Sequence, residues 1–349
     1  MAYFSLIVPV FNRPDEVHEL LESLTKQHCK DFEVIIVEDG SQVPCQEIVQ
    51  AYQNRLDIHY YNKPNSGPGQ SRNYGAERAT GEYLIVLDSD CIIPEGYLDA
   101  VKAELDAAPA DAFGGPDRAH DSFTDIQKAI NYAMTSFFTT GGIRGGKKKL
   151  DKFYPRSFNM GIRRDVYMQL GGFSKMRFGE DIDFSIRIFD AGCHCRLFPE
   201  AWVWHKRRTD MRKFFRQVYN SGIARINLHK RHPGSMKLVH LLPMVFTVGV
   251  IFLFLVACFG RLMMVYGNPD DFYNWYWLVV AALSPIILYS LLLFIDSSIQ
   301  NKSLHIGFIS IGAAFVQLFG YGFGFIEAWW KRCVLGKDEF QAFEKNFYK

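Results

Sequence analysis

No secretory leader opens this sequence. Its first residues, MAYFSLIVPVF, contain no basic residue, and their apolar run is short and interrupted by Pro9. A secretory signal needs a basic start followed by a longer apolar segment. We therefore expect the part of the chain before the first long apolar stretch to stay in the cytoplasm.

Cysteines are few and show no paired arrangement. Seven of them are scattered along the chain, and an odd, scattered set predicts free thiols. Cys193 and Cys195 flank His194, a cluster that at first sight suggests a metal site. Because no second pair stands at zinc spacing, we interpret these residues as ordinary strand positions.

Charge is nearly absent between Leu238 and Trp330, where the sequence has two basic and four acidic residues. This region contains three uncharged stretches, each near the roughly 20 residues that cross a hydrocarbon core. These candidate spans are 241–259, 275–295 and 306–326. Buried helices of a soluble domain are the alternative, but three stretches joined by short polar loops favour a membrane region over 238–332.

The segment just before these stretches is strongly basic. Residues 206–237 contain ten lysines and arginines and a single acid. Lys and Arg collect on the cytoplasmic side, so we expect a multi-pass protein of the inner or plasma membrane with a cytoplasmic N-terminal domain. Three crossings would place Lys331 and Arg332 outside, against that rule. The third stretch also suits a re-entrant or interfacial segment, so the number of crossings and the side of the polar tail 333–349 stay open.

The first part of the chain alternates between two patterns. Apolar runs of strand length lie at 4–10, 32–37 and 83–87, and segments with helical spacing separate them. Strand, helix, strand, helix predicts an α/β fold with a mainly parallel sheet covered on both faces. In such sheets ligands bind outside the carboxyl ends of the strands.

Three aspartates stand where predicted strands end: Asp39, Asp88 and Asp90. Residues two apart in an extended segment point the same way, so Asp88 and Asp90 can face one point. Converging carboxylates suit a divalent cation such as Mg²⁺ or Mn²⁺, which keeps open positions for a substrate diphosphate. The alternative is a turn that simply favours Asp and Ser.

A second acidic cluster opens the segment FGEDIDFSIRIF, whose apolar residues have helical spacing. Glu180, Asp181 and Asp183 are bunched at the amino end of this predicted helix. Acids are favoured there by the helix dipole, so ordinary capping is one interpretation. The functional interpretation is a carboxylate held as general base at the rim of a cleft.

Six stretches in order resemble the family 2 glycosyltransferases: IVPVFNRPDEVHELLESL, VIIVEDGS, NSGPGQSRNYGA, GEYLIVLDSD, RSFNMGIRRDVYMQLGGF and GEDIDFSIRIFDAGCHCRLFPEAWVWH. The resemblance implies an inverting, metal-dependent enzyme that uses a nucleotide sugar. It also implies a GT-A fold, a Rossmann-like α/β domain with a mainly parallel sheet flanked by helices, over residues 1–205. A small α-helical membrane region then follows the basic segment.

The resemblance assigns a donor site. By it, Asp39 receives the edge of the nucleobase, helped by the backbone around Pro9 and Phe11. Glu38 stands where the family more often has Asp, so its own role in the donor site is less defined. Arg72 approaches the nucleotide, and the amino end of its helix offers N–H groups to phosphate.

The resemblance also assigns the reacting groups. Asp88 lies near the ribose or the metal, and Asp90 is the direct metal ligand. His205 matches a position that reaches the metal in some relatives, with a structural histidine as the alternative. Asp181 is the candidate base, with Glu180 beside it, and a positioned carboxylate contributes about 10² to 10⁴-fold.

The function that the resemblance implies is a hexosyltransferase-type transfer from a UDP- or GDP-sugar. The expected acceptor is a lipid-linked or other saccharide in cell-envelope or exopolysaccharide biosynthesis. We expect membrane lipids, and no nucleic acid, as partners. The glycine-rich, cationic stretch 141–149 is either a lid that orders over bound donor or a solvated loop.

Three other functions compete with this one. A processive synthase is disfavoured, because the Gln-x-x-Arg-Trp signature is missing from the stretch KRRTDMRKFFRQVYN after His205. A polyprenyl-phosphate glycosyltransferase stays open, since membrane segments after a catalytic domain permit it. The intact Asp88, Asp90 and Asp181 speak against a catalytically silent membrane subunit.

Overall fold

The computed structural model describes residues 2–118, 120, 122–141 and 153–343. The predicted lid, 141–149, therefore lies outside the described residues except for its first position. The chain folds into two compact units. Unit 1 comprises Met1–Ser122, Lys148–Lys206 and Lys345–Lys349, and unit 2 comprises Phe123–Lys147 and Arg207–Glu344. The segment that begins at Phe123 thus groups with the C-terminal helices, although the sequence places it between strands of the sheet.

A seven-stranded sheet with the order β3-β2-β1-β4-β8-β6-β9 forms the centre of unit 1. Its strands are β1 (Phe4–Val10), β2 (Phe32–Asp39), β3 (Ile58–Lys63), β4 (Tyr83–Leu87), β6 (Ala112–Gly114), β8 (Asn159–Arg163) and β9 (Cys195–Leu197). The pairs among β1 to β4 are parallel, and β8 runs antiparallel to both β4 and β6. A smaller sheet has the order β5-β10-β7, with β5 (Cys91–Ile92), β7 (Asp117–Arg118) and β10 (Val203–His205).

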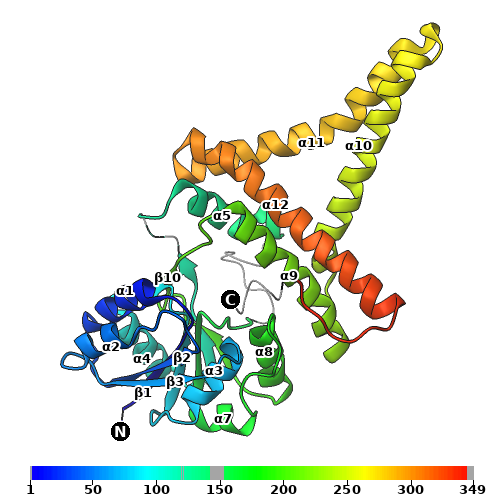
Figure 1. Ribbon diagram of the computed structural model, residues 1–349. Coiled ribbons are helices and arrows are strands. Elements are labelled where there is room, and N and C mark those ends of the chain that lie inside the picture. Colours follow the sequence, from blue (N-terminus) through cyan, green and yellow to red (C-terminus); the bar gives the residue numbers. More distant parts are fainter. Residues whose placement is uncertain (1, 119, 121, 142–152, 344–349) are drawn as a thin grey trace. The chain divides into compact units, whose positions relative to one another are not determined.

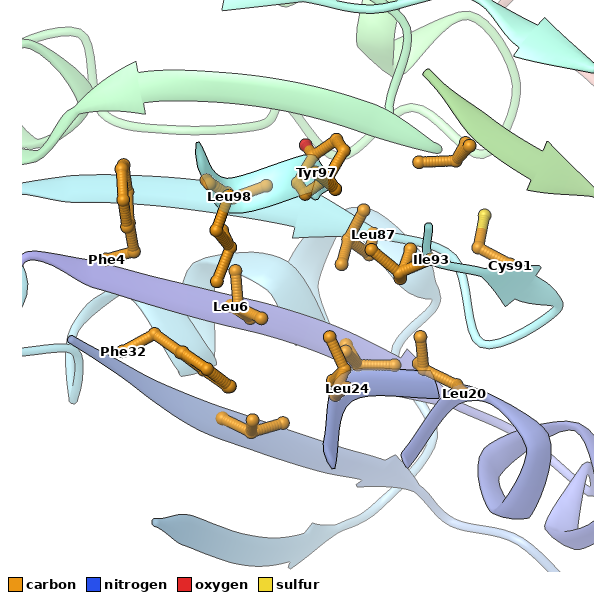
Figure 2. Close-up of a cluster of buried hydrophobic side chains, with 14 of the residues drawn as sticks. Phe4, Leu6, Leu20, Leu24, Phe32, Leu87, Cys91, Ile93, Tyr97 and Leu98 are labelled. Carbon is orange, nitrogen blue, oxygen red and sulfur yellow. The ribbon is translucent and has the colours of Figure 1, made fainter. Parts of the chain in front are cut away.

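Helices cover both faces of the large sheet. They are α1 (Pro14–Thr25), α2 (Gln46–Tyr52), α3 (Pro68–Ala76), α4 (Tyr97–Ala107), α7 (Arg164–Gln169) and α8 (Glu180–Asp190). Alternate residues of each strand enter different cores, as the two-residue period of a strand requires. Leu6 packs with α1 and α4 on one face, shown in Figure 2, and Ile7 packs with residues of α3, α7 and α8 on the other.

Local sequence explains why the helices begin where they do. Pro14 is the first residue of α1, and Asp15 and Glu16 lie in its first turn, where the helix dipole favours acids. Gly179 precedes α8 with φ 84°, a left-handed conformation that favours glycine. The predicted α/β fold with a mainly parallel sheet is confirmed.

Unit 2 is helical (Figure 1). Its elements are α5 (Asp125–Thr135), α6 (Phe137–Thr140), α9 (Met211–Arg231), η1 (Leu238–Leu241), α10 (Leu242–Tyr266), η2 (Pro269–Asp271), α11 (Phe272–Asn301), α12 (Leu304–Trp329) and the π-helical turn η3 (Trp330–Val334). Among the described residues, three segments are long and apolar enough to cross a membrane: Leu238–Tyr266, Pro269–Asn301 and Leu304–Val334. Each contains one of the predicted spans.

Candidate active site

The carboxyl ends of β1, β2 and β4 meet at one edge of the large sheet, because these strands are parallel neighbours. Asp39 is the last residue of β2, and Asp88 directly follows β4. The loop after β1 carries Phe11 and Arg13. The sequence prediction that these ends carry a site is therefore consistent with the topology.

Asp88, Asp90 and His205 lie together beside this edge. Strand β10 pairs antiparallel with β5 in a register that sets His205 opposite Cys91. The Nε2 atom of His205 lies 3.2 Å from Asp90 Oδ1 and 3.9 Å from Asp88 Oδ2. The Phe158 ring stacks on the imidazole with 4.9 Å between ring centroids. The structure thus brings together the three residues predicted to hold a metal.

Each aspartate also forms an ion pair with an arginine. Arg13 Nη1 lies 2.7 Å from Asp90 Oδ2, and Arg72 Nη2 lies 2.8 Å from Asp88 Oδ1. One oxygen of each carboxylate is therefore held by an arginine, and the other is the oxygen nearest to His205. Asp90, Cys91 and His205 each offer a ligand atom within 4.8 Å of the others, and Asp88 lies beside this group. Carboxylate oxygens and an imidazole nitrogen are donors that Mn²⁺ or Mg²⁺ accepts. These residues fit the divalent cation that the sequence predicts.

Arg72 links this cluster to the amino end of α8. Its side chain is buried, and its Nη1 atom lies 3.0 Å from Glu180 Oε1 while Nη2 contacts Asp88. The Phe173 ring lies 5.2 Å from the guanidinium carbon. A buried guanidinium between two carboxylates keeps each of the three charges compensated, which burial requires. The two acidic clusters predicted from sequence are thus joined by one side chain.

Asp181 occupies the first turn of α8 beside Glu180. Arg156 Nε donates a hydrogen bond of 2.6 Å to Asp181 Oδ2, and the Ile182 N–H donates to Oδ1 at 2.8 Å. Burial raises the pKa of the Asp181 carboxyl, but the charge and hydrogen bond of Arg156 outweigh burial and hold that pKa below its ordinary value. Burial raises the pKa of Glu180 to about 7, although Arg72 opposes the shift. Asp181 therefore ionises at a lower pH than Glu180.

Asp39 binds the loop that precedes α3. Its Oδ1 and Oδ2 atoms accept hydrogen bonds of 2.9 Å from the N–H groups of Ser66 and Gly67, and Lys63 forms an ion pair with the same carboxylate. Asp39 therefore holds the glycine-rich turn that begins the helix carrying Arg72. Its predicted contact with a nucleobase stays a prediction.

Glu38 is fully buried. Its Oε2 atom accepts hydrogen bonds from the Cys45 N–H at 2.8 Å and the Tyr60 hydroxyl at 3.3 Å, and the Ser41 hydroxyl donates to Oε1. These bonds order the loop between β2 and α2. The described contacts of Glu38 are structural, and its predicted place in the donor site stays a prediction.

Pro9 lies near the end of β1, and Phe11 is the first residue after that strand. Pro9 is in register with Val37 of β2, and Phe11 is partly buried just past the end of β1. The next residue, Asn12, has φ 54°, and its N–H donates to Ser41 Oγ at 2.7 Å. The loops after β1 and β2 are thus tied together, which places the backbone around Pro9 and Phe11 at the edge where the donor was predicted.

Two arginines of the site were missed from the sequence. Arg13 had a signal, because it directly precedes the proline that begins α1, at the edge that carries the aspartates. Arg156 begins the stretch RSFNMGIRRDVYMQLGGF, but the sequence did not reveal its role, because only tertiary packing brings it to Asp181.

Comparisons with known proteins give the family and the fold that this chain resembles. Residues 5–171 match the model of the glycosyl transferase family 2, a segment that includes Asp39, Arg72, Asp88 and Asp90 and ends before α8. The fold is similar to that of a mannosyltransferase from Pyrobaculum calidifontis solved with GDP-Man and Mn²⁺, with a TM-score of 0.56 and 16% identity, over 95% of this chain and 88% of that one. Residues 5–171 are therefore similar to the glycosyl transferase family 2, and the fold of the chain is similar to a GT-A fold.

Two curated relatives show how much of their sequences this chain matches. An uncharacterized glycosyltransferase of Haemophilus influenzae is 31% identical over 192 residues, which cover 53% of this chain and 61% of that protein. The poly(ribitol-phosphate) beta-N-acetylglucosaminyltransferase TarS of Staphylococcus aureus is 36% identical over 115 residues, or 32% of this chain and 20% of that protein. The chain spans between 13% and 61% of the length of three curated relatives that it matches.

Proposed function

We propose that the chain is an inverting glycosyltransferase that moves a sugar from a nucleotide-sugar donor to an acceptor hydroxyl. The observation that carries this proposal is the connected set of Asp90, His205, Asp88, Arg72 and Glu180, with Asp181 next in the chain. It joins a cation-type donor set to a candidate base within unit 1.

Asp181 acts as the general base in this proposal. An acceptor hydroxyl is a poor nucleophile near neutral pH, so a carboxylate must take its proton as the new bond forms. Arg156 keeps Asp181 ionised and fixes the orientation of the carboxylate. Attack on the face opposite the leaving group inverts the anomeric carbon in one displacement.

The donor binds along the carboxyl edge of the sheet. Asp39, Pro9 and Phe11 surround the nucleobase, Asp88 and Arg72 approach the ribose and diphosphate, and the similar mannosyltransferase was solved with a GDP-linked sugar. A divalent cation held by Asp88, Asp90 and His205 would supply positive charge to the leaving diphosphate. A UDP- or GDP-sugar is the donor that this arrangement favours.

The acceptor is a lipid-linked saccharide of cell-envelope or exopolysaccharide assembly. Three apolar helices follow the catalytic domain, and the basic segment 206–237 precedes them. Each basic residue near anionic lipid adds about 1 kcal/mol of attraction, so this segment favours a catalytic domain held at the inner face of the inner or plasma membrane. One relative, TarS, glycosylates poly(ribitol-phosphate) by its name.

The test of the activity is release of nucleoside diphosphate from a panel of UDP- and GDP-sugars by the full chain in detergent, with and without Mn²⁺. We expect release with one donor, and loss of release in Asp90→Asn and Asp181→Asn. Asp190→Asn is the matched control, because Asp190 is an exposed acid at the other end of α8. Equal release by all three variants would overturn the assignment of the site, and donor binding without release by the unmodified chain would indicate a silent subunit.

A second experiment tests the acceptor. The same protein is given a lipid-linked saccharide, a water-soluble saccharide and a polyprenyl phosphate, each with the active donor. We expect transfer to the lipid-linked saccharide. Equal turnover with the lipid-free acceptor would contradict the lipid requirement, and preferred transfer to the phosphate would assign the chain to the polyprenyl-phosphate enzymes.

A further inference from the structure

The amino end of α12 contacts α5, a helix that lies between β7 and β8 in the sequence. Helix α5 packs against α12, with Ala129 and Ala133 in the same buried cluster as Ala313 and Ala314. His305 Nδ1, in the first turn of α12, lies 2.9 Å from Asp125 Oδ2 at the start of α5. The chain enters α5 from β7 and leads on to β8, and no stretch between these strands is long and apolar enough to cross a bilayer. The amino end of α12 therefore lies on the same side of a membrane as the catalytic domain.

The carboxyl end of α12 is held on that side as well. The chain that follows it folds back on α9, where Asn227 Nδ2 donates to the Phe340 carbonyl at 3.2 Å and the Ala342 N–H donates to Asn220 Oδ1 at 2.9 Å. Arg231 forms an ion pair of 2.8 Å with Glu339. Helix α9 precedes every apolar segment and follows β10 after five polar residues, so it too lies on the catalytic side.

These contacts decide how α12 meets the bilayer. The helix has 26 residues, which is about 39 Å at 1.5 Å per residue, more than the roughly 30 Å of a hydrocarbon core. If α12 crossed the bilayer, its two ends would lie on opposite sides. Both ends are instead bound to segments of the catalytic side. The number of crossings between α9 and the tail is therefore even.

Helices α10 and α11 have the surface of a spanning pair. Only 11% of the apolar part of each is buried, against 44% for α12. Both helices contact α12 at one end of the pair. Thr247 Oγ1 of α10 donates to the Leu318 carbonyl at 3.3 Å, and the Ser297 hydroxyl of α11 donates to Ser310 Oγ at 2.7 Å. In Figure 1 the two helices meet at the turn η2, away from α12. Large apolar side chains cover the rest of both helices and remain exposed to the surroundings.

The far end of this pair is marked as a membrane interface. Exposed aromatic side chains surround the turn, namely Tyr266, Tyr273 and Trp277, and such residues gather at the level of the headgroups. The turn itself carries Asp270 and Asp271 and no basic residue. This composition fits the side of a membrane opposite to the one where Lys and Arg collect.

We propose that α10 and α11 form a hairpin that crosses the lipid bilayer twice, and that α12 lies in the plane of the interface on the catalytic side, across the base of the hairpin. The tail with Lys331, Arg332 and Lys337 then shares the side of the basic helix α9, as the charge rule requires. This arrangement rests on contacts within unit 2 and on the chain connections from unit 1 to α5 and α9, and it holds whatever reaction unit 1 catalyses.

Cysteine accessibility tests the proposal, and Cys333 is a native reporter because it is exposed just after α12. Three proteins are made in a background whose other native cysteines are replaced: one retains Cys333, one carries Lys213→Cys on α9, and one carries Asp270→Cys at the hairpin turn. Cys333 is replaced as well in the last two. Intact cells and inverted membrane vesicles are treated with a membrane-impermeant maleimide.

We expect Cys333 and Lys213→Cys to react from the same side and Asp270→Cys to react from the opposite side. Reaction of Cys333 together with Asp270→Cys would indicate three crossings and overturn the proposal. Reaction of all three from one side would indicate no crossing and overturn it equally. A tag fused after the last residue of the chain with all native cysteines gives a second measurement, since protease should remove it only from the side that exposes α9.

Discussion

The buried bridge made by Arg72 gives the sharpest test of the site's electrostatics. Arg72→Met removes the cation and leaves the carboxylates of Asp88 and Glu180 without it. Removing one partner of a buried ion pair costs about 3–5 kcal/mol, because the remaining charge is buried and uncompensated. For a unit of 150–250 residues, each kcal/mol lowers Tm by about 2–4 °C. We therefore expect the melting temperature of unit 1 to fall by about 6–20 °C.

A double variant separates charge from packing. Arg72→Met with Glu180→Gln removes the buried negative charge together with its partner, so the two changes should not add. We expect the loss of unfolding free energy in the double variant to be smaller than the sum of the two single losses. The difference should be about 0.5–3 kcal/mol, the range found for coupled neighbours. Asp88 is the more exposed carboxylate and keeps access to water.

The pH dependence has a definite sign. The pKa of Glu180 is raised to about 7, so its contribution to stability is complete below its ordinary pKa and is lost as pH rises through about 7. Without Arg72, which lowers this pKa, the stability lost as pH rises becomes larger. The destabilisation by Arg72→Met should therefore be greater at about pH 8 than at about pH 5.5.

The assay is thermal unfolding of the full chain in detergent, followed with a thiol-reactive dye in a background that retains only Cys45 and Cys91. Cys45 and Cys91 are buried in unit 1 and become reactive only when that unit opens. Strict additivity of Arg72→Met and Glu180→Gln, or a destabilisation that does not change with pH, would refute the charge argument.

Four further predictions concern catalysis, cation binding and packing. Asp181→Asn should lower nucleoside diphosphate release by about 10² to 10⁴-fold while calorimetry shows unchanged Mn²⁺ binding, because only the proton acceptor is lost. The rate should rise with pH through about 7, since an ionised Glu180 strengthens its neighbour as a base, and Glu180→Gln should remove this limb of the pH–rate profile. His205→Ala should weaken Mn²⁺ binding about 10-fold or more in calorimetry without donor, as expected for lost metal-site contacts. Gly161→Ala should lower Tm by several degrees in thermal unfolding, because its Cβ would lie 2.0 Å from Phe113 Cζ and overpacking costs about 1–3 kcal/mol or more.

Each of these has an outcome that contradicts it. Full nucleoside diphosphate release by Asp181→Asn would mean that another residue is the base. If the rate of Glu180→Gln still rises with pH through about 7, another group causes that rise. Unchanged Mn²⁺ affinity in His205→Ala would make this histidine structural. An unaltered melting temperature in Gly161→Ala would mean that the Phe113 ring moves freely inside the core.

Much of the fold followed from local pattern. The strands β1, β2 and β4 appeared as apolar runs of the expected length, and the apolar character of α10 and α11 followed from missing charge over about 20 residues. The aspartates at the strand ends were found because parallel strands share one edge. Arg156 was missed because its partner depends on how the chain between β8 and α8 packs, and no periodicity encodes that.

The sequence by itself determined the kinds of elements and the chemistry available to them, since hydrophobic periodicity and charge act between residues close in the chain. It could not determine which charges meet. The junction at Arg72, the counter-ions Arg13 and Arg156, and the two ends of α12 on one side depend on contacts between residues far apart in sequence. Only the tertiary structure fixes those contacts, because they arise when whole elements pack.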